Sequence, residues 1–233
     1  MPGGWEEFFR FIADPYSGPM WPLKDDQDIF KVLIPRLQAA QDKYDYVGCP
    51  DVPYFPPQPW KDGADNKLPG KKEAYFLKHN TGPAYLVEGA IVRPLVTTKE
   101  SEGRFAVASI EASSWHKNLL LKTNMSFESV HHAFHVLDGT YEITVDGSSL
   151  ELGAHQTVYV PPKTPFHLAP TSRYARVYVF ASGAGLIELL RDVGEETKTK
   201  MVGEQDNSLD SSKLHAATQG KGIELENPWK TQL

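Results

Sequence analysis

Five short runs rich in β-branched and aromatic residues constrain the fold of this chain more than any other feature of its sequence. Each run is bounded by Gly, Pro, Asp or Ser, and such runs at close spacing are typical of an antiparallel sandwich or barrel. In order they read AYLVEGAIVRPLVTT, GRFAVASIEASS, FHVLDGTYEITVDG, LELGAHQTVYVPP and ARVYVFAS. The tripeptides LDG and VDG in the third run predict hairpin turns, because Asp-Gly readily supplies positive φ. The sequence therefore predicts an all-β core.

The residues before this core have a different character. Residues 4–14 and 25–45 carry apolar side chains at helical spacing, and Pro35 is expected to kink the second helix or to begin another. Five prolines follow within CPDVPYFPPQPW, so residues 49–60 are predicted to run extended. We expect this extension to pack against the outside of the core, because it carries six large aromatic residues: Trp5, Phe8, Phe9, Tyr54, Phe55 and Trp60.

After the last β-rich run, GAGLIELLRDVGEE predicts a helix with Leu186, Leu189 and Leu190 facing inward. The residues beyond it are polar and predict a partly ordered tail. The predicted organisation is an N-terminal helical and Pro-rich extension at residues 1–72, a β core at 73–193 and a C-terminal tail at 194–233.

Composition excludes several classes of function. The net charge of −6 lacks the basic footprint of a nucleic-acid-binding protein, and the single Cys49 forms neither an internal disulfide nor a C-x-x-C zinc motif. No apolar run approaches the length of a membrane span, and acidic residues stand where a signal peptide would be basic and then apolar. We therefore expect a cytoplasmic protein that binds neither nucleic acid nor membrane.

The stretch HVLDGTYEITVDGSSLELGAHQTVYVPPKTPFH resembles the two-motif strip of the cupin superfamily. Upstream, AYFLKHNTGPAYLVEGAIVRPLVTTKESEGRFAVAS is similar to the segment leading into the first barrel of quercetinase-like bicupins, the flavonol 2,4-dioxygenases, and KYDYVGCPDVPYFPPQPW is loosely similar to their linkers. The resemblance covers roughly residues 73–193. It implies a single jelly-roll cupin barrel, a homodimer and a small-molecule substrate.

The metal motifs of the resembling family are degenerate here. Metal cupins place H-x-H, then Glu, then Gly in the first motif, and a fourth ligand, His, in the second. With Gly139 as the anchor, His132 occupies the glutamate position. The shorter family spacing puts Ser126 and Glu128 at the two histidine positions, and the longer spacing puts Met125 and Phe127 there. In the second motif the ligand position falls on Phe166, with His167 one residue later, and His155 and Lys163 replace the usual glycines.

Three histidines, His131, His132 and His135, lie within five positions of the first motif. Side chains alternate along a strand, so one face, the barrel lumen by analogy with cupins, is predicted to carry Ser126, Glu128, His132, Phe134 and Val136. His131 and His135 are then expected to point outward, unless a β-bulge exchanges the faces.

The predicted lumen suggests acid/base chemistry. A Glu–His pair is a suitable couple, so Glu128, His132 and His167 are the predicted catalytic residues. Predicted contacts to the substrate are Ser126, Phe134, Tyr159 and Phe166. No cofactor is expected. The alternative of a divalent Fe, Ni, Mn, Cu or Zn ion would use Glu128, His132 and His167 as ligands.

Three functions remain open from the sequence. Loss of the metal pattern favours a cupin enzyme acting by metal-independent acid/base chemistry, such as isomerisation, cyclisation or dehydration, on a small aromatic or polyketide-like metabolite. The resemblance itself implies a metal-dependent, ring-cleaving dioxygenase. The third is a small-molecule-binding cupin without catalysis.

Overall fold

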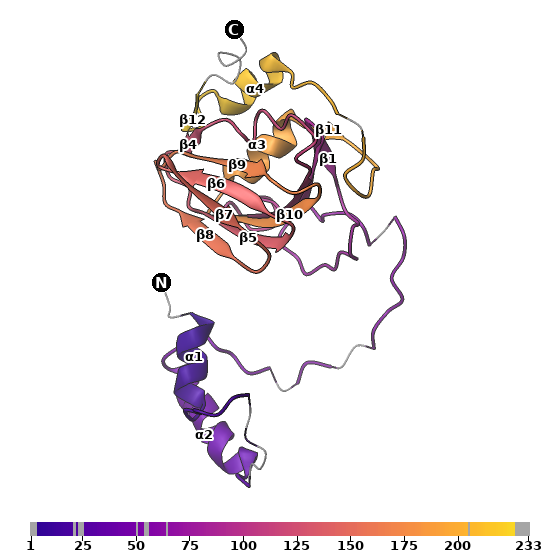
Figure 1. Ribbon diagram of the computed structural model, residues 1–233. Helices are drawn as coiled ribbons and strands as arrows, with labels where there is room; N and C mark the ends of the chain where they lie inside the picture. The colour runs from indigo at the N-terminus through magenta and orange to yellow at the C-terminus, as the bar shows by residue number, and fades with distance from the viewer. Residues whose placement is uncertain are drawn as a thin grey trace. The chain divides into compact units, whose positions relative to one another are not determined.

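The computed structural model describes residues 4–20, 22, 26–49, 51–53, 56–63, 65–204 and 206–226. The chain forms two compact units, Met1–Gln58 and Pro59–Leu233 (Figure 1). Residues 59–72, which the sequence grouped with the N-terminal extension, are tied to the second unit: the Gly70 N–H donates to Glu100 at 2.8 Å, and Lys72 pairs with Glu102 at 3.0 Å. No helix within the described residues is long and apolar enough to cross a membrane.

The first unit contains helix α1 (Trp5–Ile12) and helix α2 (Ile29–Gln41), as the apolar spacing predicted. Phe8 is buried, and its ring lies 5.4 Å from that of Tyr46. The helices are joined by Arg36, which donates to the carbonyl of Ile12 at 3.1 Å. Helix α2 continues through Pro35 as one element. Tyr54 and Phe55, two of the aromatic residues expected to dock on the barrel, lie outside the described residues.

The second unit consists of two antiparallel sheets that face each other (Figure 1). The larger sheet has the strand order β11-β1-β2-β3-β10-β5-β8, and the smaller has the order β12-β4-β9-β6-β7. The strands are β1 (Tyr85–Val87), β2 (Ala90–Val96), β3 (Ala106–Ala112), β4 (Met125–Phe127), β5 (His132–Asp138), β6 (Tyr141–Val145), β7 (Ser148–Leu152), β8 (Thr157–Val160), β9 (Phe166–Pro170), β10 (Ala175–Ala181), β11 (Glu195–Glu196) and β12 (Ile223–Leu225).

The core lies between the two sheets because alternate side chains of each strand point inward. Across the larger sheet, Val92 is opposite Ile110, Ile110 is opposite Val177, and Val177 is opposite Val136, all of them fully buried. The smaller sheet contributes Ile143 and other buried apolar side chains from its facing side. This arrangement confirms the predicted all-β core of antiparallel strands.

One of the two predicted hairpin turns is a true hairpin. The Asp146–Gly147 pair has positive φ at both residues and joins β6 to β7 in one sheet. The turn at Gly139 instead joins β5 of the larger sheet to β6 of the smaller one. The hairpin prediction for LDG is therefore wrong, because Asp-Gly marks a reversal of the chain but does not determine which partner the next strand finds.

The C-terminal region is more ordered than the polar composition suggested. Helix α3 (Gly185–Val193) buries Leu186, Leu189 and Leu190 as predicted. Beyond it, β11 pairs with β1, helix α4 (Ser211–Thr218) packs near α3, and β12 pairs with β4. Short strands that complete sheet edges need few apolar residues, so composition alone did not reveal them.

Candidate functional site

The barrel interior brings together the four positions at which the resembling metal cupins hold their ligands. These positions carry Met125, Phe127, His132 and Phe166, all buried. The His132 ring centroid lies 4.7 Å from that of Phe127 and 5.3 Å from that of Phe166, and Met125 is opposite Phe166 in the sheet. Phe134, a predicted substrate contact, is buried in the same cluster, 5.3 Å from Phe166. One buried imidazole therefore lies among the phenyl rings of Phe127, Phe134 and Phe166 in the barrel interior.

His132 is enclosed on every side. Its side chain is 1% exposed, and its Nε2 accepts a hydrogen bond from the backbone N–H of Leu186 at 3.1 Å. A nitrogen that accepts leaves the proton on Nδ1, which has no hydrogen-bond partner among the described residues. Burial, together with the nearby His131, lowers the pKa of His132 to about 3. The ring is therefore neutral and held by the N-terminal turn of α3.

Gly185 explains how the helix approaches so closely. Its φ is +51°, and a Cβ at this position would lie 2.5 Å from Nε2 of His132. Only glycine allows the start of α3 to cover the imidazole in this way. His132 is thus inward-facing, as predicted, but it belongs to a sealed core.

The other predicted catalytic residues do not join it. Glu128 is exposed, and Ser126 lines a surface pocket of about 440 Å³ together with Glu128 and Lys163. His167 is half-buried and shares a hydrogen bond of 2.7 Å with Asn124. It follows the inward-facing Phe166 on β9 and so points to the opposite face.

The prediction that Ser126 and Glu128 share a face with His132 is wrong. Strand β4 belongs to the smaller sheet and β5 to the larger one, so the chain crosses between sheets over residues 128–131. Side-chain alternation holds within a strand and does not continue through such a crossing. Met125 and Phe127, given by the longer family spacing, are the inward residues.

The outward positions of His131 and His135 are confirmed. His131 shares a hydrogen bond of 2.5 Å with the Tyr159 hydroxyl, and His135 shares one of 2.8 Å with Thr157. Tyr159, predicted to contact substrate in the lumen, is 57% exposed and lies on the outer face. Its partner across the sheet is Ala133, which also points outward.

The residues of the barrel do not fit a metal ion. Divalent metals need several N or O ligands close together, and the inward set offers one buried imidazole. Glu128, His132 and His167, the ligand set considered from sequence, are divided between the interior and two outer positions. Among the described residues no group of three or more His, Cys, Asp or Glu side chains has the proximity that a metal site requires.

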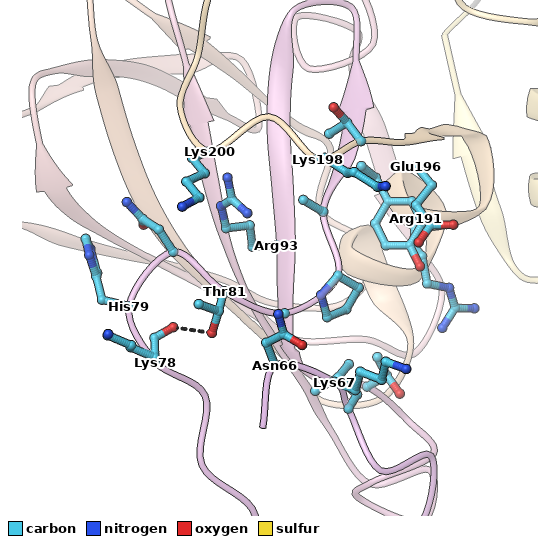
Figure 2. Close-up of a pocket in the computed structure, with 18 of the residues that line it drawn as sticks. Asn66, Lys67, Lys78, His79, Thr81, Arg93, Arg191, Glu196, Lys198 and Lys200 are labelled. Atoms are coloured by element: carbon cyan, nitrogen blue, oxygen red, sulfur yellow. Dashed lines mark hydrogen bonds between the residues drawn. The ribbon is translucent and has the colours of Figure 1, made fainter. Parts of the chain in front are cut away.

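A large pocket lies instead at the edge of the barrel, with a volume of about 1070 Å³ (Figure 2). Four separate segments form it: residues 60–70, residues 78–85, the end of β2 with the following turn, and residues 191–200. We call it the cationic pocket. It is lined by three acidic residues and by seven Lys and Arg residues, which are Lys67, Lys78, Arg93, Lys99, Arg191, Lys198 and Lys200.

Several charged groups of the pocket are already paired. Arg191 forms ion pairs with Glu188 and Asp192, and the Lys78 ammonium lies 4.9 Å from the centroid of the Trp60 ring. Glu100 accepts from Gly70 N–H and Thr97 N–H. Burial raises the pKa of Glu100, but these hydrogen bonds outweigh that effect and lower it, so the carboxylate is charged.

Four cations of the pocket have no counter-ion within the part of the chain that the structure describes. Lys67, Lys99, Lys198 and Lys200 are exposed, and none forms an ion pair with another of the described residues. Lys198 and Lys200 flank Thr199, whose carbonyl accepts from Nη2 of Arg93 at 2.8 Å. Figure 2 labels Arg93, Lys198 and Lys200 among the side chains that line the pocket. The result is a concentration of positive charge on a chain that is acidic overall.

Sequence reasoning missed this pocket. Arg93 is 4% exposed on β2, and an Arg within the apolar run AIVRPLV was the signal that could have indicated it. A buried guanidinium needs partners, so such a residue marks either a buried ion pair or a ligand site.

No protein-family model matches this sequence, and no curated protein matches it. Among solved structures the chain is similar to KdgF from Halomonas sp., with 12% identity over 48% of this chain and 94% of that chain and a TM-score of 0.39. It is also similar to an RmlC-like cupin from Shewanella frigidimarina (15% identity, 50% of this chain, 96% of that chain, TM-score 0.39) and to the Cnp3 cupin domain of Schizosaccharomyces pombe (16%, 47%, 76%, TM-score 0.33).

Proposed function

We propose that this chain is a small-molecule-binding cupin whose ligand is a small anion held in the cationic pocket. The observation that carries this proposal is a pocket lined by Arg93 and by four exposed lysines that form no ion pair with another of the described residues. The barrel interior acts as a structural core in this proposal. The proposed function is the third one that the sequence left open, a small-molecule-binding cupin without catalysis, with an anionic ligand in place of an aromatic one.

The geometry favours binding over the acid/base enzyme. A general base must reach its substrate directly or through one water molecule, and it works best with a pKa near the working pH. His132 is enclosed by Phe127, Phe166 and the start of α3, and its pKa is lowered to about 3. Glu128 and His167, its expected partners, lie outside the core.

The geometry supports a quercetinase-like dioxygenase even less than it supports the acid/base enzyme. That reaction, implied by the resemblance, depends on a metal ion held in the barrel. Met125, Phe127 and Phe166 offer no nitrogen or oxygen side-chain ligand at the positions where the resembling family binds its metal.

The charge of the pocket selects anions. Like charges grouped in a concave site focus the local field and raise the concentration of oppositely charged ligands. Exposed lysines supply charge without fixed geometry, while the guanidinium of Arg93 is held in place and offers directed donors. The net charge of −6 opposes a polyanion spread over a wide surface, so the proposed ligand is small, such as a carboxylate or phosphate compound.

Isothermal titration calorimetry with sulfate and citrate, and with neutral glycerol as the negative probe, tests this proposal. The charge-reversed variant Lys198→Glu/Lys200→Glu should weaken binding of both anions by about tenfold or more. Binding to the wild type should also weaken as ionic strength rises.

The matched control is Lys122→Glu/Lys213→Glu, which changes the net charge equally at two exposed lysines outside the pocket. It should bind both anions nearly as the wild type does. Equal weakening in the two double variants would show a general charge effect and contradict the proposed site. Absence of anion binding to the wild type would contradict the proposed function itself.

A further inference from the structure

We propose that anion binding in the cationic pocket is coupled to protonation of Glu111, the buried carboxyl group behind Arg93. This inference rests on the proposed function, and it assigns Glu111 as a positioning residue that acts through Arg93. It makes the affinity of the pocket for its anion rise as the pH falls.

The coupling starts from the arrangement of Arg93. Nη2 donates to the carbonyl of Thr199. Nε has no hydrogen-bond acceptor among the described residues but lies 3.7 Å from Oε1 of Glu111. Arg93 lines the pocket, whereas Glu111 does not. One guanidinium therefore faces the pocket on one side and a buried carboxylate on the other.

Glu111 is an unusual carboxyl group. Its side chain is on the outer face of β3 but is covered by neighbouring residues and is only 1% exposed. Neither of its oxygens has a hydrogen-bond partner among the described residues. A buried carboxylate without hydrogen bonds is held in its charged form only by nearby cations.

The groups that face Glu111 come from each neighbouring element. Arg93 lies on β2, Arg176 is opposite Glu111 on β10, and His79 precedes β1 and shares a 3.0 Å hydrogen bond with Arg176. Tyr174, just before β10, and the core residue Tyr141 are the other titratable groups near it. Burial raises the pKa of Glu111, although Arg93, Arg176 and His79 oppose this by favouring the charged form.

An anion in the pocket shifts this balance. The anion and the Glu111 carboxylate would share the positive charge of Arg93 and repel each other across it. Protonation of Glu111 removes that repulsion, so bound anion and bound proton favour each other. As the pH falls through the raised pKa of Glu111, the carboxyl group becomes neutral and no longer competes with the anion for the positive charge of Arg93.

The experiment uses inorganic sulfate, whose charge is constant between about pH 5 and about pH 8, and the variant His79→Asn as background. His79 is replaced because it lines the pocket and shares a hydrogen bond with Arg176, so that Glu111 is the group compared between the two variants. In His79→Asn, sulfate should bind about tenfold tighter at the lower pH, and calorimetry in two buffers of different ionisation enthalpy should show uptake of a fraction of a proton.

The double variant His79→Asn/Glu111→Gln provides the decisive comparison. Glutamine keeps the shape of the side chain and does not titrate, so sulfate affinity should become the same at both pH values and proton uptake should vanish. Persistence of the pH dependence in the double variant, or zero proton uptake in His79→Asn, would overturn the coupling while leaving the anion site intact. Failure of sulfate to bind the wild type at either pH would overturn the anion site and the coupling together.

Discussion

His132 provides the sharpest test of the sealed barrel interior. The perturbation is His132→Gln, which removes a titrating group and keeps an acceptor near the position of Nε2, so Leu186 N–H retains a partner. The pKa of His132 is about 3 in the folded chain, against an ordinary value of 6.5 for histidine. A depressed pKa in the folded state means that the unfolded chain binds the proton more tightly. Stability is therefore lost as the pH falls below the unfolded value.

The magnitude follows from the linkage relation. Each pH unit below about 6.5 should remove about 1.4 kcal/mol from the free energy of unfolding, until the pH approaches 3. At about pH 4.5 the accumulated loss attributable to His132 is about 2.7 kcal/mol. This is a large fraction of the stability of an ordinary domain.

The assay is urea denaturation of the full chain at a series of pH values, followed by far-UV circular dichroism. His132→Gln is expected to lower stability at neutral pH, because ring contacts with Phe127 and Phe166 are lost. The decisive quantity is the slope of stability against pH between about 6 and 4, which should become shallower than in the wild type by about 1.4 kcal/mol per unit. His135→Gln, on the outer face of the same strand, should keep the wild-type slope. An unchanged slope in His132→Gln would refute the sealed interior.

Three further predictions follow from the same structure. The double variant Phe127→His/Phe166→His should create a metal site together with the imidazole of His132, and stoichiometric Co²⁺ binding would be detected by absorption spectroscopy. Absence of Co²⁺ binding by the folded variant would contradict the assignment of these positions. Gly139→Ala should lower the melting temperature more than Gly147→Ala, since both have positive φ but only the Cβ at 139 would meet a backbone oxygen, at 2.1 Å. The chain is predicted to be a homodimer, which light scattering would measure. Phe180 is 44% exposed on the outer face of β10, and Phe180→Glu should yield monomers. A monomeric wild type would contradict this prediction.

Local rules were sufficient wherever the structure depends on a short stretch of chain. The alternating β-rich runs, the amphipathic residues of α1 and α3, and the hairpin at Gly147 all formed as the sequence predicted. The inward position of His132 also followed from its place within one strand. In each of these cases neighbours along the chain determine the outcome, so period and turn chemistry carry the information.

The sequence could not decide between the two spacings of the degenerate motif. Ser126 and Glu128 were as suitable as Met125 and Phe127 until the crossing between the sheets was known. A single residue of register exchanges every side chain between interior and exterior. Only the packing of β4 in one sheet and β5 in the other resolved this choice, and it converted a predicted polar site into an apolar core.

The sequence by itself determined an acidic chain with an antiparallel β core, because these properties depend on composition and on local spacing. Only the tertiary structure decided where positive charge gathers. The cationic pocket draws its lysines and Arg93 from three segments between residues 60 and 100 and from residues 191–200, and Glu111 meets Arg93 only through the pairing of β2 with β3. Charges distributed along a sequence have no common field until folding brings them within a few ångströms, where Coulomb interactions are strong.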